Sequence, residues 1–253
     1  MMLRMLGAPV FAISIAVAGV PQKQVQRVAT LEQKLHEAQL DFEKGIQYAD
    51  GAGVAKNMQK AAEHYRKAAE KGYVPAQYNL AYLLENGSGV PQNLKEAAVW
   101  YRKAAEQGDA QSQNNLGVMY ATGSGVAKDD AVAVRWYSLA AQQKDAQGLT
   151  NLAAMYLQGR GVPRDFARAL DLSKQAAESG YPVAQNNLAL MYANGQGVKQ
   201  DYVMAYAWLD VAASEVSAAA SLRDKMATRM TSAQVGQAKQ IAAMKIKKFR
   251  GGK

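Results

Sequence analysis

The chain contains no cysteine, so disulfide bridges, thiolate nucleophiles and cysteine-based metal sites are excluded from its chemistry. Histidine occurs only twice, as His36 and His64, and neither has a second ligand at the spacing typical of a metal site. Aromatic residues make up only 8% of the 253 residues, while alanine is abundant. This composition predicts closely packed helices and not a β-sandwich.

Acidic and basic residues balance over most of the chain, and the formal net charge of +9 arises mainly at its C-terminal end. After Asp224 there is no acidic residue, whereas eight basic residues follow: Lys225, Arg229, Lys239, Lys245, Lys247, Lys248, Arg250 and Lys253. A neutral body does not provide the charged face that duplex DNA requires, so no specific nucleic-acid partner is expected. The basic tail could make weak contact with an anionic membrane surface, or it could be a solvated helix end.

The N-terminus resembles a secretory signal peptide. Arg4 precedes an apolar run from Leu6 to Val20, and Ala16-Val17-Ala18 is a cleavage candidate with small residues at the required positions. A run of 15 residues is shorter than the roughly 20 that a membrane-spanning helix needs. We therefore expect residues 1–18 to be removed and the mature protein to be periplasmic or secreted. The alternative is an uncleaved segment that anchors the protein in the inner membrane.

A glycine-x-glycine-valine motif occurs five times, and each copy follows the previous one by 36 residues. The copies begin at Gly51, Gly87, Gly123, Gly159 and Gly195. A strict period of this length indicates stacked supersecondary units. Backbone amides of such loops can also bind phosphate, but a turn that every unit needs explains the fivefold repetition more simply.

Each unit is predicted to contain one helix before the glycine motif and one after it. The first helix combines a leucine, a small residue and a large residue four positions after the leucine, as in Leu116, Gly117 and Tyr120. The second helix follows a column of residues that cap helix N-termini: Asn57, Asn93, Asp129, Asp165 and Asp201. It repeats alanine in three columns, which begin at Ala61, Ala68 and Ala69 in the first unit. This helical spacing predicts that one face of the second helix is buried.

Over residues 38–217 these motifs resemble the Sel1-like repeats, which are relatives of the tetratricopeptide repeats. The resemblance implies an all-α fold, namely a right-handed α-solenoid of five 36-residue helix-turn-helix repeats. Residues 19–37 would form an N-terminal segment and the start of the first helix, and residues 218–253 a C-terminal capping helix and the basic tail. Thr231 and Gln234 fit a capping box in that last segment.

The resemblance further implies an adaptor that binds a protein or peptide partner along a concave face built from the first helices. The candidate contact residues on these helices are Asn79, Asn115, Asn151, Asn187, Tyr78, Asn114 and Tyr82. Asparagine is a mediocre helix former, but its carboxamide can hold a peptide backbone. Alternatively, each asparagine bonds a neighbouring repeat, because buried polar groups are normally paired.

No set of residues points to catalysis, to a cofactor or to a metal. Some proteins of the family that the repeats resemble are penicillin-binding hydrolases, but those are rich in cysteine, and the Ser-x-x-Lys motif is absent here. We therefore expect a non-catalytic scaffold or regulator of the bacterial cell envelope. An envelope hydrolase, directed at peptidoglycan or penicillin, is the alternative.

Overall fold

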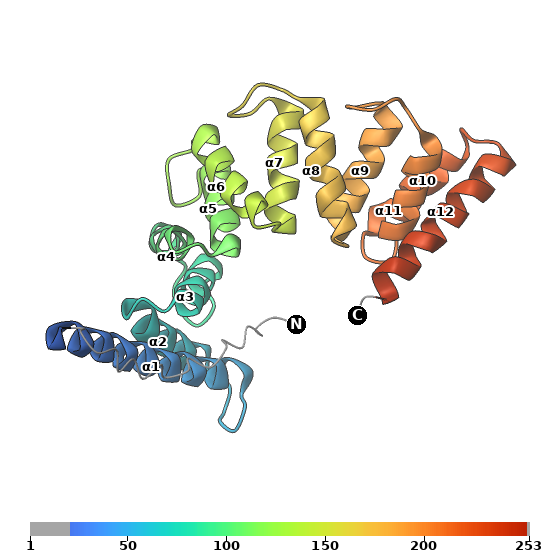
Figure 1. The fold of residues 1–253 in the computed structure, drawn as a ribbon. Helices are drawn as coiled ribbons and strands as arrows, with labels where there is room; N and C mark the ends of the chain where they lie inside the picture. Colours follow the sequence, from blue (N-terminus) through green and yellow to red (C-terminus); the bar gives the residue numbers. More distant parts are fainter. Residues whose placement is uncertain (1–20, 252–253) are drawn as a thin grey trace. The chain divides into compact units, whose positions relative to one another are not determined.

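The computed structural model describes residues 21–251, and within this range the chain is helical and contains no strand (Figure 1). The twelve helices in this range are α1 (Gln22–Asp50), α2 (Met58–Glu70), α3 (Val74–Asn86), α4 (Leu94–Glu106), α5 (Ala110–Thr122), α6 (Asp130–Gln142), α7 (Ala146–Gln158), α8 (Phe166–Glu178), α9 (Pro182–Asn194), α10 (Tyr202–Ala212), α11 (Ser217–Ala227) and α12 (Ser232–Gly251). The first ten form five helix-turn-helix repeats, with a glycine motif inside each pair. The predicted repeat architecture is confirmed.

The chain divides into two compact units. Among the described residues, the first comprises 21–112 together with 124–126, and the second comprises 113–123 and 127–251. In the first unit α1 packs on α2, α2 on α3, and α3 on α4. In the second unit the helices from α6 to α10 each pack on the next, and α10 also contacts α11 and α12 (Figure 1).

The second helix of every repeat begins at the predicted polar column. In each case the side chain of the capping residue accepts a hydrogen bond from the backbone N–H three residues later, at 2.9 to 3.1 Å. These bonds satisfy amides that have no partner inside the helix. The five capping residues are Asn57, Asn93, Asp129, Asp165 and Asp201.

The second glycine of each later motif is needed for close packing. Gly89 has a φ of +75°, and a Cβ placed there would overlap the backbone of Met58 at the start of α2. In the same way, Gly161 lies against the backbone of Asp130 at the start of α6. A side chain is therefore excluded both by backbone conformation and by lack of space. This geometry agrees with the prediction that the glycine motifs form turns between the two helices of each repeat.

The alanine columns form the core between the helices. Ala61, Ala97, Ala133, Ala169 and Ala205 are all fully buried, and the column seven residues later is buried to the same degree. Small residues on the first helices let aromatic rings approach closely. A Cβ on Gly117 would lie only 2.6 Å from the Tyr137 ring. Three tyrosines occupy equivalent positions on the second helices of the first three repeats, and all three are buried: Tyr65, Tyr101 and Tyr137.

The C-terminal segment forms two helices, α11 and α12, which are separated at residues 228–231. The predicted capping box begins α12: the Thr231 N–H donates to Gln234 Oε1 at 2.8 Å, and the Gln234 N–H donates to Thr231 Oγ1 at 3.3 Å. Ile241, Ile246 and Phe249 pack against the hydrophobic core of the second unit. The apolar side of the basic tail is thus engaged within the protein.

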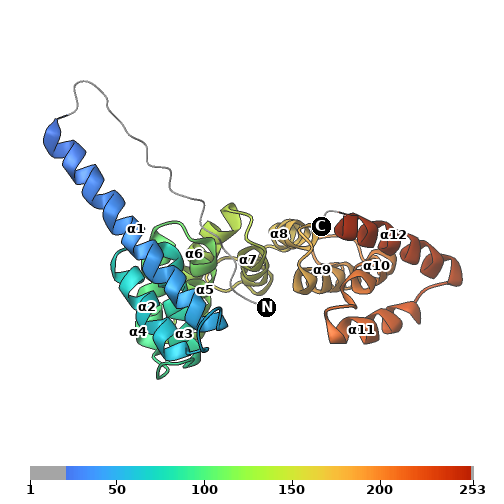
Figure 2. The ribbon, with the colours of Figure 1, turned by 90° about the horizontal axis from the view of Figure 1, so that it is seen from below.

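At the other end, α1 is longer than a repeat helix requires, with 29 residues. Among the α1 side chains that the structure describes, the first buried one is Ala38, and the amino-terminal part of α1 extends past α2 (Figures 1 and 2). The predicted signal peptide, residues 1–18, lies outside the described residues. Among the helices of residues 21–251, none has the length and apolar character that crossing a membrane would require.

Candidate partner-binding surface

In the first unit, α3 carries three of the candidate contact residues, and all three are half-buried. The Tyr78 ring meets the Tyr101 ring edge-on, with 5.9 Å between the ring centres. The Asn79 carboxamide faces the buried hydroxyl of Tyr65 but forms no regular hydrogen bond with it. The third residue, Tyr82, lies one helical turn after Tyr78 on the same side of α3. α3 therefore presents an aromatic surface in which part of each ring is accessible.

In the second unit, asparagines link neighbouring first helices. Asn151 Nδ2 on α7 donates to Asn114 Oδ1 on α5 at 2.8 Å. Asn114 Nδ2 in turn donates to Gln147 Oε1 at 3.1 Å and to Asn115 Oδ1 at 3.3 Å. Asn114 is only 3% exposed, so its carboxamide is committed to helix packing. Asn115 and Asn151 remain half-buried and retain part of their surface.

The α9 residues at the equivalent positions are placed differently. Asn187 is half-buried, and the Oδ1 atom of its neighbour Asn186 is buried without a hydrogen-bond partner. A buried carbonyl oxygen of this kind normally finds a donor. At the corresponding place on α7, Thr150 is buried and its hydroxyl donates to the Ala146 carbonyl at 2.6 Å. Of the positions compared, those on α9 have the greatest unused capacity for hydrogen bonding.

A column of glutamines, which no sequence motif singled out, fixes the first helices against the second ones. Gln107 Nε2 donates to Gln77 Oε1 at 2.7 Å, and in the second unit Gln143 Nε2 donates to Gln113 Oε1 at 2.8 Å. Gln185 Nε2 bonds the Ala177 carbonyl at 3.3 Å. The constant spacing of 30 residues in both glutamine pairs was available in the sequence. Their burial was not, since glutamine is usually exposed.

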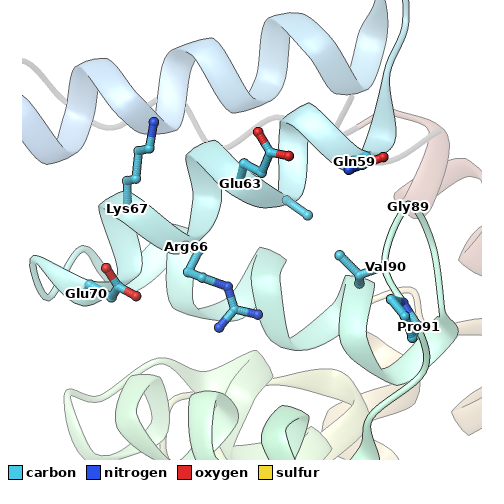
Figure 3. A pocket seen from close by; sticks show the side chains of 9 residues that line it. Gln59, Glu63, Arg66, Lys67, Glu70, Gly89, Val90 and Pro91 are labelled. Carbon is cyan, nitrogen blue, oxygen red and sulfur yellow. The ribbon is translucent and has the colours of Figure 1, made fainter.

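The first unit also contains a surface groove of about 530 Å³ between α2 and the loop that joins α3 to α4 (Figure 3). Its lining residues are Gln59, Ala62, Glu63, Arg66, Lys67, Glu70, Gly89, Val90 and Pro91. Both acidic and basic side chains surround the apolar Val90 and Pro91. No motif in the sequence singled out this groove, because it arises where the loop of one repeat meets the helix of the previous one.

One wall of the groove is fixed by an ion pair. Arg66 on α2 donates to Glu96 Oε1 on α4 at 2.5 Å, and Trp100 Nε1 donates to the same carboxylate at 3.2 Å. The Arg66 hydrogen bond lowers the pKa of Glu96, although burial opposes this shift. Both partners are about one-third exposed, so the pair contributes little to stability. The ion pair fixes the orientation of the Arg66 side chain at the groove.

Two ionisable side chains outside the groove, His64 and Tyr137, are packed against neighbouring helices. His64 stacks on Tyr48 with 5.7 Å between ring centres, and its Nδ1 lies 3.4 Å from Asp41. Burial raises the pKa of Tyr137 to about 12, which keeps that hydroxyl protonated at neutral pH. Within residues 21–251 there is no cluster of three or more side chains suited to hold a metal ion.

The fold defines an all-α helical-repeat protein with a polar surface on the first helices of its repeats. The chain belongs to the Sel1 repeat family, whose repeats match residues 45–73, 74–109, 110–145, 146–181 and 182–215. The family resemblance seen in the sequence is confirmed. Sel1 repeat proteins are generally non-catalytic scaffolds for protein–protein interaction.

Three solved structures illustrate the similarity. A protective antigen with an SLR fold from uropathogenic Escherichia coli is 38% identical, with a TM-score of 0.67 over 77% of this chain; the match spans only 41% of that protein's chain. A Sel1 repeat protein from Oxalobacter formigenes is 33% identical, with a TM-score of 0.68 over 76% of this chain and 80% of that chain. An immunity protein from Pseudomonas aeruginosa is 21% identical over 83% of both chains, with a TM-score of 0.50, and shares the fold alone. No curated protein is similar enough to count as a match.

Proposed function

We propose that this protein is an adaptor or regulator of the bacterial cell envelope that binds a segment of a partner protein along the first helices of its repeats. The supporting observation is the contrast between the invariant alanine core and the side chains that vary from repeat to repeat on these helices. Val118, Ala154 and Leu190 occupy equivalent positions and are all partly exposed. A binding surface needs such variation beside a constant scaffold.

Within the second unit, α9 is the preferred part of this surface. Leu190 supplies a partly exposed apolar side chain, and Asn187 supplies a half-buried carboxamide one turn away. An extended peptide carries backbone donors and apolar side chains in the combination that these residues match. We propose Asn187, with Asn115 and Asn151, as hydrogen-bonding contacts and Tyr78 and Tyr82 as an aromatic contact on the first unit.

Cross-linking and affinity capture of the mature protein in its host would test this function. Leu190→Lys should abolish recovery of the specific partner. Leu139→Lys is the matched control, because Leu139 is 40% exposed in the same unit but lies on α6, a second helix. Equal recovery with both variants, after melting curves show that both fold, would remove α9 from the binding surface.

We also propose that the protein is exported and that residues 1–18 are cleaved. The support is the sequence pattern of Arg4, the apolar run to Val20 and the small residues at 16–18. Mass spectrometry of the protein from its host should find an N-terminus near residue 19. Recovery of the intact chain from the inner membrane would favour the anchored alternative, and recovery of the intact chain from the cytoplasm would contradict an envelope role.

Weak contact of the C-terminal segment with an anionic membrane surface is a second proposal. Lys239, Lys247 and Lys248 are exposed and make no ion pair in the described part of the chain. Because Ile241, Ile246 and Phe249 pack inward, the contact would be electrostatic and would not involve insertion of the helix. Sedimentation with vesicles containing about one-third phosphatidylglycerol should show salt-sensitive binding. Equal binding to neutral phosphatidylcholine vesicles would contradict the proposal.

A further inference from the structure

An apolar stripe runs along α1 and is only half covered. It consists of residues at alternating steps of three and four: Val28, Leu31, Leu35, Ala38, Phe42, Gly45 and Ala49. Residues at this spacing lie on one side of a helix. The last four are buried, whereas Val28, Leu31 and Leu35 are 45%, 65% and 38% exposed.

The buried half of the stripe packs against another helix, α2. Phe42 packs against the Tyr65 ring of α2 at 5.5 Å between centres, and Gly45 leaves room for the same ring. At the end of α2, Lys71 Nζ lies 2.9 Å from Asp41 and 3.4 Å from Glu37. Helix α2 therefore ends beside residues 37–41, and α1 continues past it (Figure 2). The exposed half of the stripe is continuous with a helix–helix interface.

We propose that residues 22–37 of α1 dock an amphipathic helix of another protein, which carries acidic residues beside its apolar stripe and lies in line with α2. These 16 residues offer a seat about 24 Å long, enough for four helical turns. The proposal concerns a different surface from the first helices of the repeats and does not depend on that proposed function.

Charge indicates the chemistry of the incoming helix. Residues 22–37 contain two acidic residues, Glu32 and Glu37, and three basic ones, Lys23, Arg27 and Lys34. Glu37 already lies 3.4 Å from Lys71 Nζ, so Glu32 is the one acidic group of this segment without an ion pair in the described part of the chain. Arg27 and Lys34 are seven residues apart, so they lie on the same edge of the stripe. None of the three basic residues makes an ion pair in the described part of the chain. Asp41, which lies further along α1, is by contrast paired with Lys71 at the end of α2. An acidic edge on the partner would complement them.

The same features argue against a second copy of this chain as the occupant. In a parallel pair, the second α1 would continue into the space that α2 already fills. In an antiparallel pair, the edge with Arg27 and Lys34 would face the same edge of the other copy, which brings like charges together. A helix from another protein meets neither obstacle.

The test uses the full chain and two synthetic peptides of three heptads with leucine at the core positions, one flanked by glutamate and the other by lysine. Fluorescence anisotropy should show binding of the glutamate-flanked peptide, weakened by salt, and no comparable binding of the lysine-flanked one. Leu31→Asp should weaken binding roughly 10- to 100-fold, the equivalent of losing one buried leucine. Its melting temperature should stay unchanged because Leu31 is exposed.

Leu40→Asp is the matched control, since Leu40 is 44% exposed on the same helix but lies off the stripe. Equal loss of binding with both variants would overturn the proposal, as would equal binding of the two peptides. Light scattering that shows a dimer broken by Leu31→Asp would identify a second copy as the occupant. Binding that appears only after removal of residues 1–20 would identify the chain's own N-terminus as the occupant. Either the dimer or this dependence on truncation would overturn the proposal.

Discussion

Asn151 on α7 donates a hydrogen bond to Asn114 on α5 at 2.8 Å, and Asn114 is buried. An asparagine that sequence reasoning assigned to partner contact thus also ties two adjacent first helices together. The two roles are compatible, because Asn151 is only half-buried. The relative weight of the two roles can be measured at this position.

We predict that Asn151→Ala lowers the free energy of unfolding by about 1 to 3 kcal/mol, because it leaves the buried Asn114 oxygen without its donor. Asn115→Ala should cost less, since Asn115 only accepts a long bond of 3.3 Å from Asn114. Urea denaturation of both variants provides the comparison. Equal stability of Asn151→Ala and the parent protein would show that the Asn151–Asn114 bond is not structural.

The repeat pattern could be predicted from the sequence because its determinants are local. Capping residues such as Asn57 and turn glycines such as Gly89 act within a few residues of their own position, so their identities and spacing define the helices directly. The same holds for Ala61 and the other alanine columns, whose period marks a buried face.

The surface could be predicted only in part, because it depends on which neighbour each side chain meets. The sequence does not distinguish the buried Asn114 from the half-buried Asn115, since the difference arises from the packing of α7 beside α5. The groove at Val90 likewise requires the placement of one repeat against the previous one. The break between α11 and α12 was also not anticipated.

The close approach of glycine loops gives a second prediction. Gly89→Ala should destabilise the protein by about 1 to 3 kcal/mol more than Gly53→Ala, because the added methyl group must displace the backbone of Met58. The two glycines have almost the same φ, +75° and +74°, but a Cβ on Gly53 would meet no atom within 4 Å. Thermal unfolding of both variants isolates the packing contribution. Equal costs would mean that backbone conformation alone selects these glycines.

Overpacking of the alanine core gives a third prediction. Ala104→Leu and Ala140→Leu should each lower stability by about 1 to 3 kcal/mol, since both side chains are fully buried. Ala131→Leu is the control for helix propensity, because Ala131 lies on α6 with Ala140 but is exposed. Urea midpoints of the three variants should separate the buried positions from the exposed one. If Ala140→Leu is as stable as Ala131→Leu, the alanine column has room for larger side chains.

Lys144 adopts a φ of +61° two residues after the end of α6, and no other non-glycine residue described has a positive φ. The equivalent residues of three other repeats are Gly72, Gly108 and Gly180, each with a positive φ. A left-handed conformation costs a residue with a side chain about 1 to 2 kcal/mol, whereas glycine adopts it without strain. Glycine also gains freedom in the unfolded chain, which offsets about 0.4 to 1 kcal/mol of this relief.

We therefore predict that Lys144→Gly stabilises the protein, by up to about 1.6 kcal/mol after the two effects are combined. Arg135→Gly, at an exposed position in the middle of α6, provides the opposite control and should destabilise by about 1 kcal/mol, because glycine is a poor helix former. Melting temperatures measured under identical conditions should move in opposite directions for the two variants. A lower melting temperature for both variants would show that the Lys144 side chain contributes more to stability than its backbone strain costs.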